Sequence, residues 1–558
     1  MSTNYDLKSV KLPRLAGGAL KAVCNLMEND LMSGFIIPSL LRDAGITHFR
    51  TLNFEDSPVF MPMYAADAGG EIPTGSVPAR ELIEKGNFRP PTILDYANAY
   101  QSGDASPSTV AEQFLKAVAE SDQGPTPLRS MVAVDKTDIR TQAAASTARW
   151  QQGKPLSQFD GVPIPIKDEL DQTPYPTTVG TSVLGKQPAS QDSTAAARLR
   201  KLGALLVGKA NMHEIGIGVT GLNPHHGTTR NPYAPTHFTG GSSSGPAAAV
   251  SSGLAPVAIG ADGGGSIRIP ASFCGIVGLK ATFGRVSEFG AAPLCWSVAH
   301  VGPLANTALD AALTYAAIAG PDSLDPNSLA QPPISLAGFD NFDLKDLKIG
   351  VYWPWFRHAE SQVVSVCEKM LSQMEKSGAK IIEIEVTNLE AIRVAHIVTI
   401  GTEMYTALAK EYAQQKQMFG LDVRTNLAIA SHFKSSDYVL AQKVRAHAMK
   451  TFTNVLQKVD VIALPATGIS APIIPPDALP AGESDLTTLL EIMRFATPGN
   501  LTGLPAISFP AGYTDLGMPI GFQMMGKPWH EHTLLRLAHF AETICTKRKP
   551  KLYWDLLS

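Results

Sequence analysis

The residues best suited to covalent chemistry lie in one segment of small side chains, residues 240–266. It reads GGSSSGPAAAVSSGLAPVAIGADGGGS, with 8 glycines, 6 serines and 6 alanines among 27 residues, and Asp262 is its only charged residue. A flexible linker is excluded, because Val, Leu and Ile are interspersed and ordered α/β patterns bracket the segment. Close packing of a helix on a strand explains part of this composition, but it does not require a glycine–serine turn at each end.

The second turn, Gly263-Gly264-Gly265-Ser266, leaves consecutive backbone N–H groups unshielded by side chains. Such a run can hold the oxyanion that forms when a nucleophile attacks a carbonyl carbon. A serine needs a base to attack an amide, and the segment contains no histidine. A lysine kept neutral by burial is the alternative base, since desolvation disfavours the ammonium form.

The candidate base is Lys167, which ends the mostly apolar run in GVPIPIKDE, residues 161–169. A lysine in this position is expected to be more buried than a typical surface lysine. By itself, however, the pattern is also typical of a structural lysine, so the catalytic interpretation depends on the other segments.

Three other motifs do not fit their usual chemistry. Gly216, Gly218 and Gly221 spell G-x-G-x-x-G, but LNPHHG follows and no helix can begin there to bind a pyrophosphate. Gly241–Gly245 matches G-x-S-x-G, yet the preceding NPYAPTHFTG predicts a loop instead of the buried strand of a nucleophile elbow. The histidines never reach the H-E-x-x-H spacing of a zinc site.

Taken together, GVPIPIKDE, GGSSSG and GADGGGSIRIPASFCGIVGLKAT resemble the amidase signature family in order and spacing. The resemblance extends from about residue 92 to the C-terminus and includes GKANMHEIGIG, VGPLANTALDAAL and TPGNLTGLPAISFPAGYTDLGMPIGFQMMGKP. It implies an α/β fold in which helices cover both faces of a large central mixed β-sheet. It also implies an amidase that hydrolyses a carboxylic amide C–N bond and releases ammonia or an amine.

The resemblance further implies a Ser–Ser–Lys triad. Ser266 would be the nucleophile, Ser242 would relay the proton from a cis peptide bond, and neutral Lys167 would be the base. Water would then hydrolyse the acyl-enzyme, with no metal and no organic cofactor.

The supporting residues are implied by the same resemblance. The backbone N–H groups of Gly263, Gly264, Gly265 and Ser266 would form the oxyanion hole. Ser243 would hydrogen-bond within the site, and Asp262 and Arg268 would brace the loop by an ion pair. The family commonly has Thr where this chain has Ala261 and Gly263, and Gly where it has Ser244, so we expect a change in loop stiffness but not in catalysis.

A second function with the same triad stays open, the A subunit of a glutamyl-tRNA amidotransferase, which supplies ammonia to a partner subunit. Against it stand a 90-residue N-terminal extension and the lack of any basic stretch beyond Lys547–Lys551. We therefore expect a stand-alone enzyme with a small-molecule amide substrate and no nucleic-acid partner.

The positioning elements follow from hydrophobic periodicity. Alternating helical and strand patterns predict an α/β body. Helices are predicted at Ser193–Leu202, Ala308–Ala319 and Val363–Lys376, and another begins at Ser106-Pro107. Seven apolar runs predict buried strands: Met131–Val134, Ala204–Val207, Ile349–Tyr352, Ile381–Val386, Val461–Leu464, Ala506–Phe509 and Ile520–Met524.

Two regions lie outside this alternation of helical and strand patterns. Residues 1–91 predict a helical and irregular N-terminal extension ahead of a catalytic domain at 92–558. In the extension Leu20, Val23, Met27 and Leu31 share one helix face, which we expect to pack on the body, with peripheral membrane contact as the alternative. Residues 58–91 predict a proline-rich strap.

The other region, residues 387–458, is helix-like throughout and is expected to wall the substrate pocket. Candidate lining residues are Met404, Tyr405, Met418 and Phe419, whose character suggests a hydrophobic or aryl acyl group, although a core role fits equally well. Fatty acid amides, aryl amides, peptide C-terminal amides, carbamates and small aliphatic amides therefore all remain open as substrates.

Composition excludes several classes of protein. The chain has 558 residues, a net charge of −3 and 44% hydrophobic residues, which excludes a disordered chain and a polyanion binder. Five scattered cysteines without a CxxC pair exclude a disulfide framework and a zinc ribbon. Without a signal peptide or an apolar run of 18 residues, a cytoplasmic protein with no integral membrane segment is expected, and a homodimer is left open.

Overall fold

The computed structural model describes residues 5–73, 75 and 88–558, and its centre is one 11-stranded sheet. The strand pairs β10–β11, β10–β12, β3–β4 and β3–β7 are parallel and the other pairs antiparallel, so the sheet is mixed. In sheet order the strands are β11 (Lys380–Glu383), β10 (Lys348–Val351), β12 (Val461–Pro465), β15 (Pro519–Gly526), β14 (Ala506–Tyr513), β8 (Val277–Lys280), β9 (Val301–Ala305), β7 (Val257–Ala261), β3 (Pro163–Lys167), β4 (Leu205–Ala210) and β2 (Met131–Ala133).

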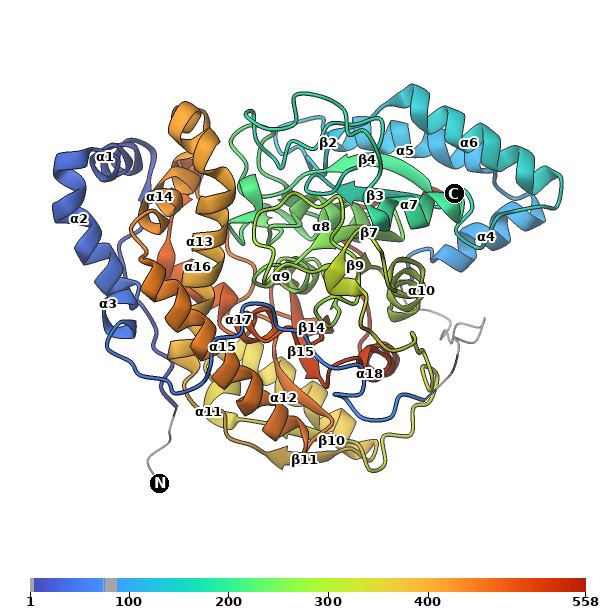
Figure 1. Cartoon of the computed structure of the whole chain (residues 1–558). Coiled ribbons are helices and arrows are strands. Elements are labelled where there is room, and N and C mark those ends of the chain that lie inside the picture. Colours follow the sequence, from blue (N-terminus) through green and yellow to red (C-terminus); the bar gives the residue numbers. More distant parts are fainter. Residues whose placement is uncertain (1–4, 74, 76–87) are drawn as a thin grey trace.

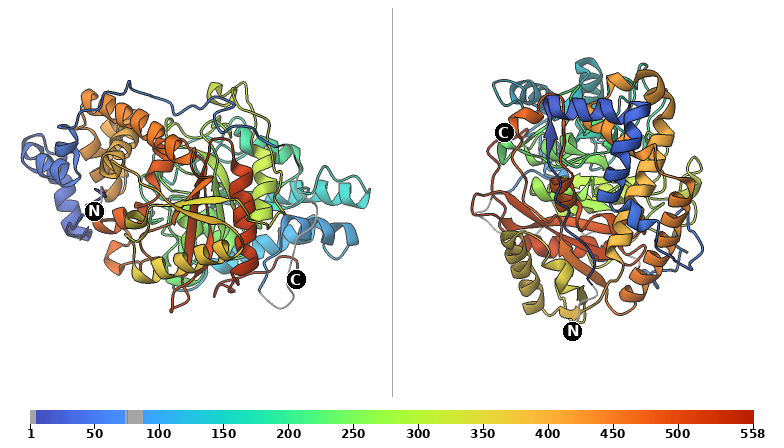
Figure 2. Two further views of the ribbon diagram at one scale, coloured as in Figure 1. Left: turned by 90° about the horizontal axis from the view of Figure 1, so that it is seen from below. Right: turned by 90° about the vertical axis from the view of Figure 1, so that its left-hand side faces the viewer.

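Helices lie on both sides of this sheet in the ribbon views (Figures 1 and 2), which is the architecture that the sequence resemblance implied. They are α1 (Gly17–Met27), α2 (Asp30–Asp43), α3 (Ile46–Phe49), α4 (Ile93–Ser102), α5 (Pro107–Ser121), α6 (Lys136–Gln151), α7 (Thr194–Lys201), α8 (Ser244–Ser251), α9 (Arg268–Phe273), α10 (Ala308–Ile318), α11 (Trp353–Phe356), α12 (Ser361–Lys376), α13 (Leu389–Gln415), α14 (Leu421–Ala430), α15 (Ser435–Leu456), α16 (Leu486–Met493), α17 (Thr497–Leu501) and α18 (Glu531–Ile544). Two small two-stranded sheets pair β1 (Leu15–Ala16) with β13 (Glu483–Ser484) and β5 (Arg230–Asn231) with β6 (Ala234–Phe238).

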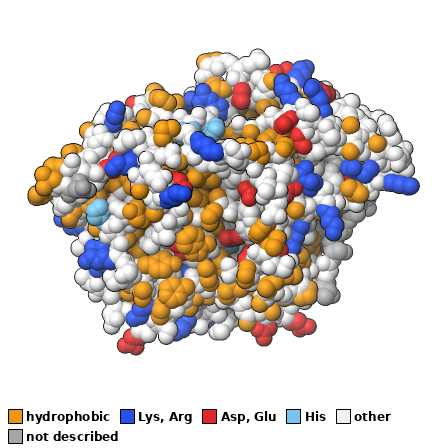
Figure 3. Space-filling view, turned by 45° about the horizontal axis from the view of Figure 1, so that its top comes forward, with side chains coloured by type: hydrophobic (Ala, Val, Ile, Leu, Met, Phe, Trp, Pro, Cys, Tyr) orange, Lys and Arg blue, Asp and Glu red, His pale blue; other side chains and the backbone are white. Residues whose placement is uncertain are grey.

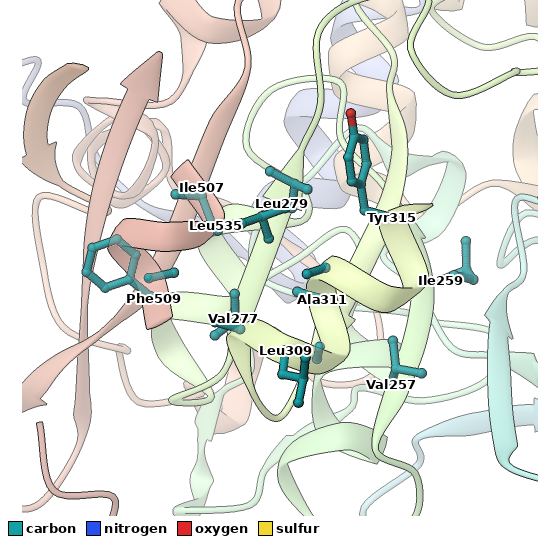
Figure 4. Packing of buried hydrophobic residues seen from close by; sticks show 14 of the residues in the cluster. Val257, Ile259, Val277, Leu279, Leu309, Ala311, Tyr315, Ile507, Phe509 and Leu535 are labelled. Atoms are coloured by element: carbon teal, nitrogen blue, oxygen red, sulfur yellow. The ribbon is translucent and has the colours of Figure 1, made fainter. Parts of the chain in front are cut away.

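Both faces of the sheet are buried. Along β12, Val461 and Ala463 belong to one apolar cluster, whereas Ile462 and Leu464 belong to another. Figure 4 shows the first cluster, where side chains of β7, β8 and β14 meet those of α10 and α18. A strand with two buried faces reads as a continuous apolar run, and this is why such runs predicted strands successfully.

All seven predicted strands are present, as are the predicted helices, including α5 with its N-cap at Ser106. The strands β3, β7, β8 and β9 were not predicted, since proline and glycine interrupt their apolar patterns, as at Pro165 and Gly260. The loop predicted before Gly241 was only partly correct, because β5 and β6 form a short ribbon there, separate from the main sheet.

The N-terminal helix ends earlier than its pattern suggested. Leu20 and Met27 lie on the buried face of α1, but Leu31 belongs to α2 and is 76% exposed. The chain breaks here because the side chain of Asn29 accepts hydrogen bonds from the N–H groups of Leu31 and Met32, which makes it the N-cap of α2. The expected single helix face was therefore wrong at Leu31.

The N-terminal helices pack against the 387–458 region. Arg424 of α14 donates to Glu28 at the end of α1 at 2.6 Å, and the Tyr412 hydroxyl of α13 donates to the same carboxylate at 3.0 Å. We propose that residues 1–91 form an extension to a catalytic domain at 92–558; residues 74 and 76–87 of the strap lie outside the described residues. Within the described part of the chain, no helix combines the length and apolar character needed to cross a bilayer.

Candidate active site

Strand β3 carries Lys167 into the interior of the molecule. Ile164 and Ile166 belong to the main apolar cluster, so alternation along the strand directs Lys167 to the opposite face. Its side chain is 1% exposed. The strand is held between β4 and β7, and this parallel pairing fixes the position of the lysine at the end of the strand.

Three oxygen atoms surround the Lys167 amino group. Nζ donates a hydrogen bond to Ser242 Oγ at 2.8 Å and to the Ala261 carbonyl at 3.1 Å. The third oxygen is Glu169 Oε2, 2.7 Å away. The peptide bond between Gly241 and Ser242 is cis. Lys167 and Ser242, 75 residues apart in the sequence, thus form a direct, buried contact.

Ser266 lies next to the Ser242 segment through the backbone. The N–H of Ser243 donates to the Ser266 carbonyl at 3.2 Å, and the Ser243 hydroxyl donates to the Ala261 carbonyl at 3.2 Å. Ser266 itself is 4% exposed. The structure therefore brings the loop before α8 and the loop before α9 together around the end of β7.

The glycine loop is built around the buried Asp262 carboxylate. Arg268 donates to it through Nε at 3.0 Å and through Nη2 at 3.1 Å, and both side chains are fully buried. Burial acts to raise the pKa of Asp262, but the Arg268 guanidinium outweighs it and holds that pKa well below its usual range. Asn500 and Gln523, from α17 and β15, hold Arg268 in turn at 2.6 and 2.7 Å.

The N–H groups of the glycine loop differ in what they bind. The N–H of Gly265 donates to Asp262 Oδ1 at 2.6 Å. Among the hydrogen bonds found within the described residues, none uses the N–H of Gly263, Gly264 or Ser266. These three groups are the donors that a developing oxyanion could use, whereas the Gly265 N–H would have to be shared with Asp262.

His396 was missed by sequence reasoning. It lies on α13, and its Nε2 lies 2.8 Å from the Gly263 carbonyl. Burial lowers the pKa of His396 to about 4, so the ring is neutral at ordinary pH and Nε2 donates to this carbonyl. The only signal in the sequence was a histidine inside an apolar helical pattern, which does not reveal that α13 crosses over the glycine loop.

The four predicted pocket residues separate in the structure. Met404, Tyr405 and Phe419 join an apolar cluster that also holds Met212 and Cys295. An added Cβ on Gly263 would lie 3.0 Å from Cys295 Sγ, which places this cluster beside the glycine loop. Met418 is not part of the cluster and is 49% exposed.

A cavity of about 210 Å³ lies beside Glu169. Its lining includes acidic, apolar and aromatic side chains, among them Glu169, Ala261, Glu288, Cys295, Trp296 and Asp325. In the described part of the chain, no group of three His, Cys, Asp or Glu side chains is arranged to hold a metal ion.

The sequence of this chain is similar to those of known enzymes. Residues 109–535 match the model of the family described as Amidase. The chain belongs to this family, and it is an amide hydrolase that acts on carbon–nitrogen bonds. It is 41% identical to a fatty acid amide hydrolase of Medicago truncatula, over 100% of this chain and 97% of the relative.

Two further relatives help to place the chain within the family. The solved peptide amidase of Stenotrophomonas maltophilia superposes with a TM-score of 0.71 at 26% identity, over 82% of this chain and 98% of that one. The A subunit of the glutamyl-tRNA(Gln) amidotransferase of Neisseria meningitidis is 32% identical over 80% of this chain and 96% of the relative. This Neisseria protein is thus more distant than the hydrolase from Medicago.

Proposed function

We propose that the chain hydrolyses long-chain acyl amides with Ser266 as nucleophile, Ser242 as proton relay and Lys167 as base. The observation that carries the proposal is the buried contact of 2.8 Å between Lys167 Nζ and Ser242 Oγ, in a site that excludes water from the lysine. In the proposed mechanism the amine form of Lys167 accepts a proton from the Ser242 hydroxyl, which the ammonium form cannot do.

The proposed reaction has two halves. Ser266 Oγ forms a bond to the amide carbon while its proton passes to Ser242 Oγ and the Ser242 proton passes to Lys167 Nζ. The N–H groups of Gly263, Gly264 and Ser266 support the oxyanion, and the Gly263 carbonyl is fixed by His396. The C–N bond then breaks as the proton returns through Ser242 to the leaving nitrogen, and water releases the acid by the same route.

The acyl specificity rests on the cluster around Met404, Tyr405 and Phe419. Its apolar side chains lie beside the glycine loop, where the acyl chain of a bound substrate would begin. The Medicago relative, named a fatty acid amide hydrolase, spans the whole chain, and this supports a hydrophobic acyl group. Five free cysteines support a reducing, cytoplasmic location.

A panel of amides tests this substrate class. We expect the purified chain alone to hydrolyse N-acyl amides of twelve or more carbons with a kcat/KM at least about ten-fold above acetamide and butyramide, since each buried methylene contributes about 0.8 kcal/mol. Released amine is measured at equal enzyme concentration. A preference for the short amides would contradict the hydrophobic pocket, and inactivity in the absence of a partner protein would favour the amidotransferase alternative.

We also propose that α1 and α2 contact a lipid surface. Leu26, Leu31, Met32 and Phe35 are exposed there, Leu31 and Phe35 each to 76%. In the space-filling view of Figure 3, hydrophobic side chains gather at the left edge of the molecule, where Figure 1 places these helices. Neighbouring exposed apolar side chains of this size are typical of an interaction site.

The lipid contact predicts a specific loss of vesicle binding. Replacing both Leu31 and Phe35 by serine is expected to lower the fraction bound to phosphatidylcholine vesicles at least ten-fold, because burying each side chain contributes about 1.5–3 kcal/mol. Leu516→Ser is the matched control, since Leu516 is 91% exposed but lies outside these helices. Co-sedimentation measures binding, and equal binding of all three proteins would contradict the contact.

A further inference from the structure

Glu169 is the acidic group that touches Lys167. Its Oε2 lies 2.7 Å from Nζ, and the two side chains are 8% and 1% exposed. Gly216, with φ of +71°, makes room for this arrangement: an added Cβ there would lie 3.4 Å from Ser242 Oγ and 3.8 Å from Glu169 Oε2. The carboxylate, the amine and the relay hydroxyl therefore share one buried space.

The titratable groups around this pair are mostly acidic. Glu288 and Asp325 line the cavity beside Glu169. The carboxyl group of Glu403, on α13, acts electrostatically on Glu288 and Cys295. Burial raises the pKa of Glu288 well above its usual value, and repulsion by Asp325 and Glu169 adds to the effect. Burial likewise raises the pKa of the Cys295 thiol. Lys167 is the cation that faces Glu169 among these groups.

We propose that Glu169 is a positioning residue that acts through Lys167. The proposal rests on the proposed triad. When the proton of Ser242 reaches Lys167, the resulting ammonium lies between Ser242 Oγ and a fixed carboxylate, which stabilises the positive charge. The proton then returns from Lys167 through Ser242 to the leaving nitrogen, and Glu169 takes no part in the transfer. Glu169 thus does for the lysine what the aspartate of a Ser–His–Asp triad does for its histidine: it orients the base and stabilises its protonated form.

In this role the Glu169 carboxylate has two opposite effects on the rate of hydrolysis. The carboxylate strengthens Lys167 as a base, so it raises the rate once the lysine is neutral. It also favours the ammonium before substrate reacts, so it moves the acid side of the pH–rate profile to higher pH. A residue that only shaped the site would change the rate without moving the profile.

The experiment compares kcat/KM from pH 5 to pH 10 for the full chain and three variants. Glu169→Gln keeps the shape but removes the charge, and we expect a plateau about ten-fold lower and an acid midpoint at least about 1 pH unit lower. Glu169→Asp withdraws the carboxylate by one methylene and is expected to fall between wild type and Glu169→Gln in both quantities. Asp325→Asn is the matched control, because it removes another carboxyl group from the same cavity wall, and its midpoint is expected not to move.

Each outcome decides the role of Glu169. A lower plateau with an unmoved midpoint, in either Glu169 variant, overturns it, as does a midpoint that moves equally in Asp325→Asn. Should Glu169→Gln fail to fold, the Glu169→Asp profile alone gives the answer by the same criterion. Failure of the proposed function is distinguishable, because it would appear as activity that survives the loss of Ser266 or Lys167.

Discussion

Ser266→Ala abolishes both amide hydrolysis and labelling by a fluorophosphonate probe, if the proposed nucleophile is correct. The hydroxyl is the atom that would form the acyl-enzyme, so no other group in the loop can replace it. Removing the serine of an unrelated triad costs about 10⁶-fold in kcat, and we expect a loss of at least about 10⁴-fold here. Released amine measures turnover, and in-gel fluorescence measures labelling.

The control for this variant is another buried serine of the same small-residue segment. Ser251 lies on α8, and its hydroxyl is buried without a hydrogen-bond partner among the described residues. Ser251→Ala is therefore expected to label and turn over at close to the wild-type rate. Hydrolysis that persists in Ser266→Ala at more than about one hundredth of wild type would remove Ser266 from the mechanism.

Lys167→Met is expected to slow both acylation and labelling by about 10³-fold or more. General-base catalysis contributes about 10²–10⁴-fold, and without Nζ the Ser242 hydroxyl has no acceptor for its proton. Because the lysine must be neutral to act, the wild-type rate falls as the pH is lowered. The residual rate of the variant loses this dependence on the acid side. Labelling rates, corrected for the fraction of folded protein, give the comparison.

Lys209→Met tests whether the loss of any buried lysine would have the same effect as Lys167→Met. Lys209 lies on β4, beside β3, and is also fully buried, but it donates to the Leu170 carbonyl and the Thr177 hydroxyl rather than to a serine of the site. This variant is expected to unfold at lower temperature yet to label at a similar rate per folded molecule. If the two lysine variants labelled equally fast, Lys167 would be a structural residue.

The sequence was sufficient for the elements whose residues repeat a simple pattern. Strands with both faces buried, such as β12, appear as apolar runs, and the N-cap at Ser106 identified the start of α5. Lys167 and Ser242 could be named in advance because their surrounding motifs are specific to a family. The structure brings the two side chains into direct contact, although they are 75 residues apart in the sequence.

The features that could not be predicted from the sequence depend mostly on contacts between distant segments. His396 reaches the Gly263 carbonyl from 133 residues away, and nothing local distinguishes it from any other histidine in a buried helix. Glu169 follows a lysine by two positions, but only the fold turns its carboxylate back to the amine. The break between α1 and α2 was missed for a different reason: a single capping side chain, Asn29, overrode a continuous helical spacing.

The pairing of β1 with β13 has a consequence for how the chain is made. Arg14 binds Glu483, 469 residues further along, so the β1–β13 pairing can form only after the long intervening segment has been synthesised. The apolar face of α1, with Leu20, Cys24 and Met27, likewise stays uncovered until α14 has been synthesised. Contacts of such long range slow folding and prolong the exposure of apolar surface. We therefore expect the N-terminal helices to dock late in folding.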